Sequence, residues 1–417
     1  MEGDNIMKVL LMGVGGQGGP AASIMASDND IDKIVIGDIN TDMAKKVQEK
    51  IGSNKIEIKK VDARDIDDIA TAAEGMDVVL DLVTPQFYYN ILQGALKAKT
   101  NYVNTAYDKF MWDNKMELGK KPKLYDEFVA CNKTAMLGCG MSSGYTNVIA
   151  KLYIDKCDTV KSVKVRLAKK DLSIGKYGDA VTAWNPGWNP IQALLDFKLP
   201  STVFRDKKYE LKTKPFSEIE EWEFPEPMGK MPVSLHAHEE PYSIPLSFAS
   251  KGLEYCDFKY YVNMQIAPVI ALGLASDEPI EVDGVKVKPL DVVLSKVPKP
   301  GDIFLNEDPS TFDYLDKNKI VSMMVEVKGK KDGKDVTYNV YIPTMGAPRR
   351  ETYEHYGTFN VQVALPAVTG SKVIVDGEAG KTDVPKGVIF PHDLDPKYFL
   401  KVMEKSGFTH RFKVVNA

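Results

Sequence analysis

The pattern of apolar and polar positions alternates regularly up to about residue 110. Short apolar runs, typical of buried parallel strands, are separated by amphipathic segments of about ten to fifteen residues, typical of helices. Strands and helices in this order form βαβ units, so the pattern predicts an α/β domain with a Rossmann-type, doubly wound parallel sheet. The predicted strands lie within Lys8–Gly13, Lys33–Asp38, Ile56–Ala63, Asp77–Val83 and Asn101–Tyr107.

From Lys161 to Val368 the pattern changes, and strand-like runs dominate. Loops rich in proline, glycine and tryptophan separate these runs, and KDGKD (Lys331–Asp335) carries the Asp-Gly signal of a tight hairpin. We therefore predict a second, α+β domain built on a mixed or antiparallel sheet. Near the end of the chain, DPKYFLKVMEKSGF returns to helical periodicity.

The first predicted turn has the sequence GVGGQG, in which Gly13, Gly15 and Gly18 have the spacing G-x-G-x-x-G between a strand and a helix. In that context the first glycine allows a tight turn, the second lets the backbone approach a pyrophosphate, and the third lets helix and strand pack closely. The N-terminus of the helix adds unpaired N–H groups and a positive dipole end for the phosphates. The alternative is a glycine turn that binds nothing, but the strand–turn–helix context favours a dinucleotide.

Asp38 ends the second apolar run, where a carboxylate can accept hydrogen bonds from the ribose 2′-hydroxyl. The following residues, INTD, contain no arginine for a 2′-phosphate, so we predict NAD rather than NADP. The turns after the next strands are predicted to lie near the adenine and the nicotinamide ribose, although ordinary strand-to-helix turns are an equal alternative. The predicted cofactor residues are Gly13, Gly15, Gly16, Gln17, Gly18, Asp38, Ile39, Asp62, Ala63, Thr84 and Pro85.

The stretch SLHAHEEPYSIP, Ser234–Pro245, brings two histidines and two glutamates close together in the sequence. If this stretch is extended, His236, His238 and Glu240 point to one face, because alternate residues of a strand share a face. Such a face could be a metal triad, a catalytic acid/base pair or a cradle for a cationic substrate. A purely structural strand with exposed histidines is a further alternative. Because no further ligand cluster is evident, we predict no metal site.

The composition limits the class of protein. The chain has 417 residues, enough for two domains, with 44% hydrophobic and 27% charged residues. A net charge of −4, with lysines and acids interspersed, argues against a nucleic-acid partner. The longest apolar run is too short to span a bilayer and the start of the chain lacks a signal peptide, so we expect no membrane partner. The four cysteines lack CxxC spacing, which predicts reduced thiols in a cytoplasmic protein.

Four motifs together resemble the saccharopine dehydrogenase-like family, which includes saccharopine reductases, lysine 6-dehydrogenases, carboxynorspermidine dehydrogenases and bacterial homospermidine synthases. The motif GCGMSSGYTN is similar to the family's G-x-x-P-G-x-x-N turn but departs from it at one point. Where relatives have proline, often preceded by aspartate, this chain has Ser143, preceded by Ser142. The motifs are GVGGQG with Asp38, GCGMSSGYTN (Gly138–Asn147), TAWNPGWNP (Thr182–Pro190) and HEEPYSIP (His238–Pro245).

The resemblance implies a nucleotide-binding Rossmann domain at residues 1–135 and a substrate-binding and dimerisation domain at residues 136–369. It also implies that residues 370–417 pack back on the first domain and complete it. Relatives act on small molecules with amine and carboxylate groups, bound between the two domains, and are commonly homodimers through the middle domain. We therefore expect a small amine or amino-acid substrate and a homodimer.

The resemblance also implies roles for individual residues. His238 would be the acid or base, and Glu240 would line the floor of the site and hold a substrate cation. Trp184 would cover the same cation through its ring face. Weaker substrate-binding candidates, which more often cap or pack, are Asn147, Tyr107 and Asp108.

The implied reaction is hydride transfer between a nicotinamide and the carbon that bears a nitrogen in a lysine-, saccharopine- or carboxynorspermidine-like substrate. Such an enzyme is an NAD-dependent dehydrogenase acting on CH–NH or CH–NH2 groups. Two alternatives remain. One is a homospermidine synthase-like aminoalkyl transferase that keeps NAD as a prosthetic group, and the other is a non-catalytic dinucleotide sensor.

Overall fold

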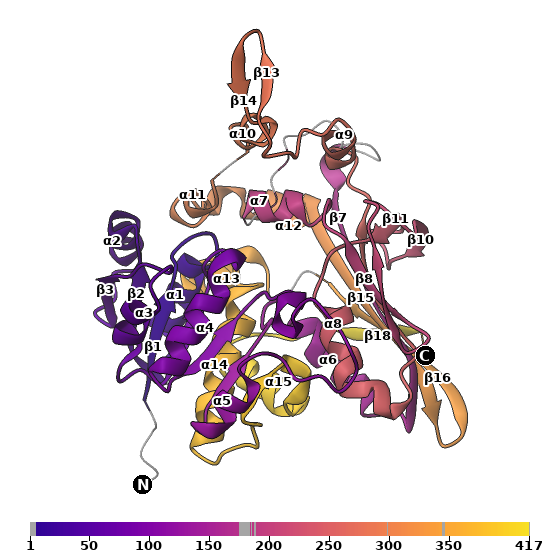
Figure 1. Cartoon of the computed structure of the whole chain (residues 1–417), viewed down its shortest axis with the longest axis horizontal. Helices are drawn as coiled ribbons and strands as arrows, with labels where there is room; N and C mark the ends of the chain where they lie inside the picture. Colours follow the sequence, from indigo (N-terminus) through magenta and orange to yellow (C-terminus); the bar gives the residue numbers. More distant parts are fainter. Residues whose placement is uncertain are drawn as a thin grey trace.

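The computed structural model describes residues 6–174, 184, 186, 189–297, 299–343 and 347–416. Two sheets form the body of this structure, and helices lie between them (Figure 1). Among the residues of the predicted aromatic loop, the structure describes Trp184, Pro186, Asn189 and Pro190, and the other residues of that loop lie outside the described part.

The first sheet has seven strands in the order β17-β6-β5-β4-β1-β2-β3, and all neighbours are parallel. The predicted doubly wound parallel sheet is therefore confirmed. Its strands are β1 (Met7–Met12), β2 (Ile31–Asp38), β3 (Ile56–Lys60), β4 (Val78–Asp81), β5 (Asn101–Asn104), β6 (Thr134–Met136) and β17 (Gly387–Ile389). Its helices are α1 (Gly18–Ser27), α2 (Thr41–Ile51), α3 (Ile66–Ala73), α4 (Tyr88–Lys97) and α5 (Tyr125–Ala130).

Local signals in the sequence explain where these helices begin and end. The side chain of Asn40 accepts a hydrogen bond from the backbone of the first turn of α2, and Gly52 ends that helix with a φ of 68°. Asp65 caps α3 by accepting from two backbone N–H groups of its first turn. Strands β4 and β5 are buried along their whole length, as expected for parallel strands covered on both faces.

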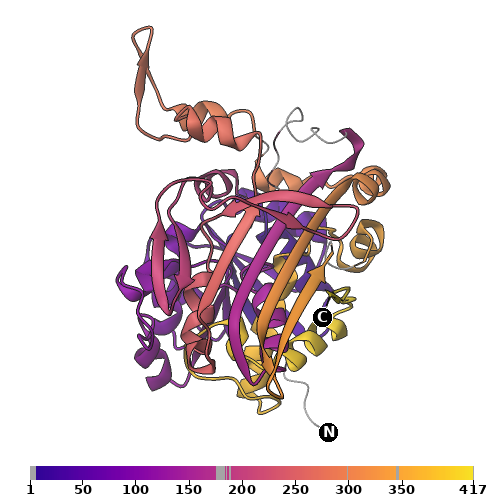
Figure 2. The same ribbon diagram turned by 90° about the vertical axis from the view of Figure 1, so that its right-hand side faces the viewer.

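The second sheet has nine strands and is mixed, as predicted: β7 is parallel to β12 and antiparallel to β15. The hairpin predicted at KDGKD joins β15 to β16, with Asp332 and Gly333 at φ values of 50° and 73°. Figure 2 shows the long strands of this sheet side by side. Its strands are β7 (Thr159–Asp171), β8 (Ser201–Arg205), β9 (Lys208–Lys212), β10 (Glu220–Glu223), β11 (Lys230–Leu235), β12 (Tyr255–Tyr261), β15 (Lys319–Lys331), β16 (Lys334–Ile342) and β18 (Lys413–Asn416).

The last part of the chain contributes to both sheets. Helix α14 (Ala364–Glu378) packs on α1 and on β4 and β5, and β17 is the edge strand of the parallel sheet. Helix α15 (Pro396–Lys405) packs on α14 and on α6 (Tyr145–Ile154), and β18 then pairs with β16 of the second sheet. The segment therefore contacts the first sheet, as the family resemblance implies, and also joins the second.

The largest apolar cluster extends across the boundary between the two sheets. It includes Val9 and Leu11 of the parallel sheet, Val165 of the second sheet, and residues of α6 and α14 between them. The opposite face of the parallel sheet has its own cluster, formed with α3 and α4. The two sheets are thus joined by a continuous core rather than by a thin polar contact.

A projection built from residues of the predicted second domain leaves the body of the molecule (Figure 2). It contains α9 (Ile266–Ala271), the hairpin of β13 (Ile280–Val282) and β14 (Val285–Val287), and α10 (Pro289–Leu294). Helices α11 (Pro300–Leu305) and α12 (Phe312–Asn318) lead back to β15, and α13 (Arg349–Tyr356) follows β16. Across the described residues, no helix has both the length and the apolar character needed to cross a membrane.

Candidate active site

The glycine-rich turn has the geometry that its sequence predicts. Gly13 has a φ of 85°, a conformation that glycine adopts without strain. A Cβ at Gly18 would lie 1.9 Å from the Gly13 carbonyl oxygen, so only glycine allows this approach of helix to strand. A Cβ at Gly15 would have no protein atom within 4 Å. The backbone at Gly15 is therefore free to approach a ligand, and the turn fits a pyrophosphate.

This contrast predicts two different outcomes for the same substitution. Gly15→Ala should leave the melting temperature within about 1 °C, because the methyl group enters open space, but it should weaken dinucleotide binding about tenfold or more. Gly18→Ala should destabilise the fold by about 1–3 kcal/mol through overpacking. Thermal unfolding and titration with the dinucleotide measure both effects. A loss of stability in Gly15→Ala would contradict the assignment of its open side to a ligand.

Asp38 lies at the end of β2, next to the glycine turn. Its carboxylate accepts hydrogen bonds from the backbone N–H groups of Val14, at 2.9 Å, and Asn40, at 2.7 Å. The carboxylate is half-buried, and it is held where the predicted ribose contact requires it. Ile39 is 54% exposed beside it.

The other predicted cofactor residues follow β3 and β4 at the same edge of the sheet. The Asp62 carboxylate is bonded to the Arg64 guanidinium at 2.6 Å, and Ala63 lies between them. Thr84 is exposed and precedes a short 3₁₀ helix that starts at Pro85. Arg64 therefore places a cation at this edge of the sheet, paired with Asp62.

The HAHEEP stretch is not an extended strand, so the condition for His236, His238 and Glu240 to share one face is not met. Strand β11 ends at Leu235, and helix α8 (Glu240–Phe248) begins at Glu240. Pro241 in the first turn favours a helix start, because proline lacks the N–H group that a first turn leaves unpaired. His238 therefore lies in the connection between β11 and α8, and Glu240 is the first residue of α8.

The carboxylate of Glu240 is completely buried, and both of its oxygens are occupied. One oxygen accepts hydrogen bonds from Ser142 Oγ at 2.5 Å and from Thr146 Oγ1 at 3.0 Å. The other is bonded to His238 Nδ1. This geometry favours Glu240 as a residue that orients His238, in place of the direct contact with a substrate cation that we expected.

The charges of this pair stabilise each other. Burial opposes a charged imidazole, but the carboxylates of Glu240 and Glu239 outweigh it and raise the pKa of His238 to about 9. Burial likewise opposes a charged Glu240, but the His238 cation and the hydrogen bonds lower the pKa of that carboxyl below its ordinary value. At neutral pH the pair is therefore an imidazolium and a carboxylate. The other ring nitrogen, Nε2, remains for proton exchange.

Glu239 is an acid of this site that is partly exposed, unlike Glu240. Its side chain is 15% exposed, and one oxygen lies 3.2 Å from His238 Nδ1. Burial raises the pKa of Glu239 to about 7, and burial also raises the pKa of nearby Asp196 to about 7. A cationic group at this position would lower both pKa values, so these two acids offer a site for a substrate cation.

Contacts place this site at the carboxyl ends of the parallel strands. Tyr107, which follows β5, donates a hydrogen bond from its hydroxyl to the Glu239 carbonyl at 3.2 Å. Ser142, which follows β6, bonds to Glu240. The glycine turn and Asp38 follow β1 and β2 in the same parallel sheet, so the predicted cofactor residues and the histidine–glutamate pair lie at one edge.

Three other predicted substrate residues have different surroundings. Asn147 is buried, where its side chain accepts from the Gly144 N–H and bonds to His392 at 3.0 Å. Asp108 caps a 3₁₀ helix and accepts from the Tyr88 hydroxyl. Trp184 packs in an apolar cluster with Phe197 and Tyr260. None of these three has a described contact with His238 or Glu240, and the geometry favours structural roles for Asn147 and Asp108.

His236 does not share a face with Glu240. Its ring is buried, stacks on Tyr260 at 5.0 Å and meets Phe197 edge-on at 4.6 Å. Burial lowers the pKa of His236 well below its ordinary value, so it is neutral. Among the described residues, the donor atoms of His238, Glu239 and Glu240 lie within 4.8 Å of one another, which makes this trio the set to consider for a metal ion.

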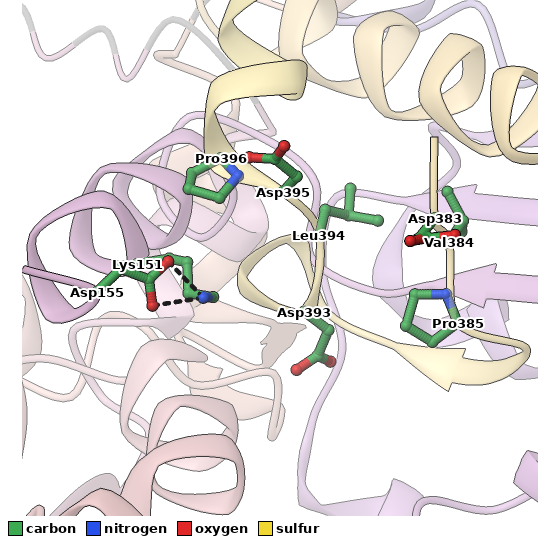
Figure 3. A pocket seen from close by; sticks show the side chains of 9 residues that line it. All are labelled: Lys151, Asp155, Asp383, Val384, Pro385, Asp393, Leu394, Asp395 and Pro396. Carbon is green, nitrogen blue, oxygen red and sulfur yellow. Dashed lines mark hydrogen bonds and ion pairs between the residues drawn. The ribbon is translucent and has the colours of Figure 1, made fainter. Parts of the chain in front are cut away.

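A separate hollow of about 540 Å³ lies between α6 and the segment that leads into α15 (Figure 3). Four aspartates line it, and Asp155 is paired with Lys151 at 2.5 Å. The side chain of Asp393 accepts from Ser247 and from the Phe390 N–H. The hollow contains none of the predicted site residues, and three of its four aspartates, Asp155, Asp393 and Asp395, already have partners.

Comparisons with known proteins agree with these observations. Residues 9–136 match the family model of the saccharopine dehydrogenase NADP binding domain. A carboxyaminopropylagmatine dehydrogenase of Synechocystis sp. is 23% identical over 412 residues, which cover 96% of each chain. The resemblance to the saccharopine dehydrogenase-like family is thereby confirmed.

Two solved structures share the fold. The apo saccharopine dehydrogenase (L-Glu forming) of Saccharomyces cerevisiae has a TM-score of 0.68 at 16% identity, covering 98% of this chain and 100% of that one. The homospermidine synthase of Legionella pneumophila, in complex with NAD, has a TM-score of 0.59 at 12% identity, covering 99% of this chain and 92% of that one. At these identities the two structures establish the fold alone.

Proposed function

We propose that the protein is a dehydrogenase acting on a C–N bond, because residues 9–136 match the family model of the saccharopine dehydrogenase NADP binding domain. In this reaction a hydride passes between a nicotinamide and the carbon that bears a substrate nitrogen. The observation that carries the proposal is the His238–Glu240 pair, an imidazolium and a carboxylate held at the carboxyl ends of the strands that also bear the glycine turn.

A nicotinamide, when bound, accepts or supplies the hydride, and the residues of the chain handle the proton and the charge. Glu240 fixes His238 through Nδ1, so Nε2 can give a proton to a substrate nitrogen or take one from it. Glu239 and Asp196 lie nearby to stabilise an ammonium or iminium. Because the pKa of His238 is about 9, the imidazolium prevails at neutral pH and favours the reductive direction there.

The substrate that we propose is a small polyamine-like or amino-acid-like molecule. The acids around His238 suit a cationic nitrogen, and the Synechocystis relative is named as a dehydrogenase of carboxyaminopropylagmatine. Purified protein should therefore form NAD(P)H with one of lysine, saccharopine, carboxynorspermidine or carboxyaminopropylagmatine, or consume it with a matching aldehyde and amine. Formation of a new polyamine without net change in NADH would indicate a transferase, and dinucleotide binding without any turnover would indicate a sensor.

We further propose that NAD is the preferred dinucleotide. The Asp38 carboxylate would repel a 2′-phosphate, and Ile39 offers it no charge. Arg64 lies at the same edge of the sheet, but its guanidinium is already bonded to Asp62. The double substitution Asp38→Ser and Ile39→Arg should shift the ratio of the NAD and NADP dissociation constants at least about tenfold toward NADP, or about 1.4 kcal/mol. Tighter binding of NADP by the unmodified protein would contradict this preference.

A further inference from the structure

A buried line of hydrogen bonds crosses the carboxyl edge of the parallel sheet, from the end of β4 to the turn after β6. Asp81, the last residue of β4, accepts from the Val83 N–H at 2.9 Å and from the Tyr102 hydroxyl at 2.7 Å. The Asn104 side chain donates to the same hydroxyl at 3.0 Å and accepts from the Gly138 N–H at 2.9 Å. Asp81, Tyr102 and Asn104 are all buried, so water does not compete for these bonds.

The β4 end of this line touches the glycine turn. A Cβ at Gly13 would lie 3.0 Å from Val83 Cγ2 and 3.2 Å from the Val83 nitrogen. The backbone of Val83 therefore packs directly against the first glycine of the turn. The line begins where the dinucleotide is predicted to bind.

The other end of the line holds the turn after β6. Beside the bond to the Gly138 N–H, the Asn104 carbonyl accepts from the Cys139 N–H at 2.7 Å. The turn then closes on itself, because the Gly140 N–H donates to the Ser143 carbonyl at 2.8 Å. Two successive backbone groups at its start are thus bonded to Asn104, so the position of Asn104 determines the position of the whole turn.

This turn supplies the hydroxyl groups that hold the histidine–glutamate pair. Ser142 in the turn and Thr146 just after it donate to the Glu240 carboxylate, which is bonded to His238. We propose that Asn104 is a positioning residue, which acts through the turn to fix this pair relative to the glycine turn. This inference rests on the proposed function and deepens it: Asn104 sets the separation between the ring that exchanges the proton and the site of the nicotinamide.

The same strand offers a matched control at its amino end. The Asn101 side chain donates to the Asp77 carbonyl at 2.9 Å and accepts from the Thr134 N–H at 3.0 Å, so it too bridges the two neighbouring strands. Asn101 is buried like Asn104, but it lies at the opposite edge of the sheet from the candidate site. Each alanine variant removes the acceptor of one buried backbone N–H, so the melting temperature should fall by similar amounts in both.

Only the variant at the carboxyl edge should lose activity. Asn104→Ala should lower kcat about 10- to 100-fold, because a small displacement of reacting groups slows the reaction even when binding is retained. Its NAD dissociation constant should stay within about threefold, and Asn101→Ala should keep kcat within about twofold. Tyr102→Phe removes only the hydroxyl of the line, so it should lower kcat by less and remains informative if Asn104→Ala does not fold. Steady-state kinetics, NAD titration and thermal unfolding measure these effects.

Hydrogen exchange on the full chain separates this inference from the proposed function, because it needs no turnover. In Asn104→Ala, exchange should accelerate in residues 138–146 and also at the start of α8, where Glu240 lies, whereas Asn101→Ala should leave both segments unchanged. Faster exchange in both segments, without turnover of any amine by the unmodified protein, would support the hold of Asn104 on the pair and reject the proposed reaction. Equal losses of kcat in the two asparagine variants, unchanged kcat in Asn104→Ala, or exchange that does not change at α8 would overturn the inference.

Discussion

Replacing His238 by glutamine should lower kcat about 10²- to 10⁴-fold on the true substrate, the usual contribution of a positioned acid or base. The glutamine side chain can still bond to Glu240, but it cannot exchange a proton near neutral pH. Dinucleotide affinity should stay within about twofold, because the described contacts of His238 are with Glu239, Glu240 and aromatic rings rather than with the glycine turn. The measurement is steady-state kinetics with parallel titration of the dinucleotide.

A suitable control is His355→Gln, since His355 lies on α13 and bonds to the Ser406 carbonyl, outside the site. It should leave kcat unchanged. Treatment with a chelator tests the metal alternative for His238, Glu239 and Glu240: activity that is lost with the chelator and returns with zinc or iron would replace the acid/base role. Full activity of His238→Gln would reject both roles.

Glu240→Gln should lower kcat/KM by about thirtyfold to several-thousandfold, which corresponds to the loss of about 2–5 kcal/mol at a buried charged pair. The fold should be retained, because the amide oxygen can still accept from Ser142 and Thr146 while the amide nitrogen meets His238. The change removes the charge that outweighs burial at His238, so the pKa of the imidazole should fall well below about 9.

The pH dependence gives this prediction its specific readout. In the oxidative direction the neutral imidazole takes the proton, so kcat/KM of the unmodified enzyme should rise with pH and level off near pH 9. In Glu240→Gln the levelling point should move to lower pH, because less of the base is protonated at a given pH. Ser142→Ala, which removes one hydrogen bond to the carboxylate but keeps its charge, should leave the levelling point near pH 9 and is therefore a control for the loss of charge. An unmoved profile in Glu240→Gln would contradict the orienting role.

The architecture was predictable from local patterns, whereas the contacts of the site were not. Strand and helix periods identified the parallel sheet, and the glycine spacing identified the turn, because both are encoded within a few residues. The helix start at Glu240 also had a local signal in Pro241, but the alternation of histidines in HAHEEP matches a strand equally well.

The partners of Glu240 could not be predicted in this way. Ser142 and Thr146 are about a hundred residues away in the sequence, and only the packing of α6 against the start of α8 brings them to the carboxylate. The departure from the family pattern at Ser142 was visible, but its consequence, a hydroxyl donated to Glu240, was not.

The path of the last fifty residues through both sheets also affects how the chain matures during synthesis. A ribosome that has completed residues 9–136 has made the region matched by the family model, but it has not yet made α14, which covers β4 and β5, or the edge strand β17. Until those residues emerge, an apolar face of the nascent sheet stays open to solvent and to chaperones. The nucleotide-binding region is therefore contiguous in sequence only in part, and its sheet is completed only after α14 and β17 have been made.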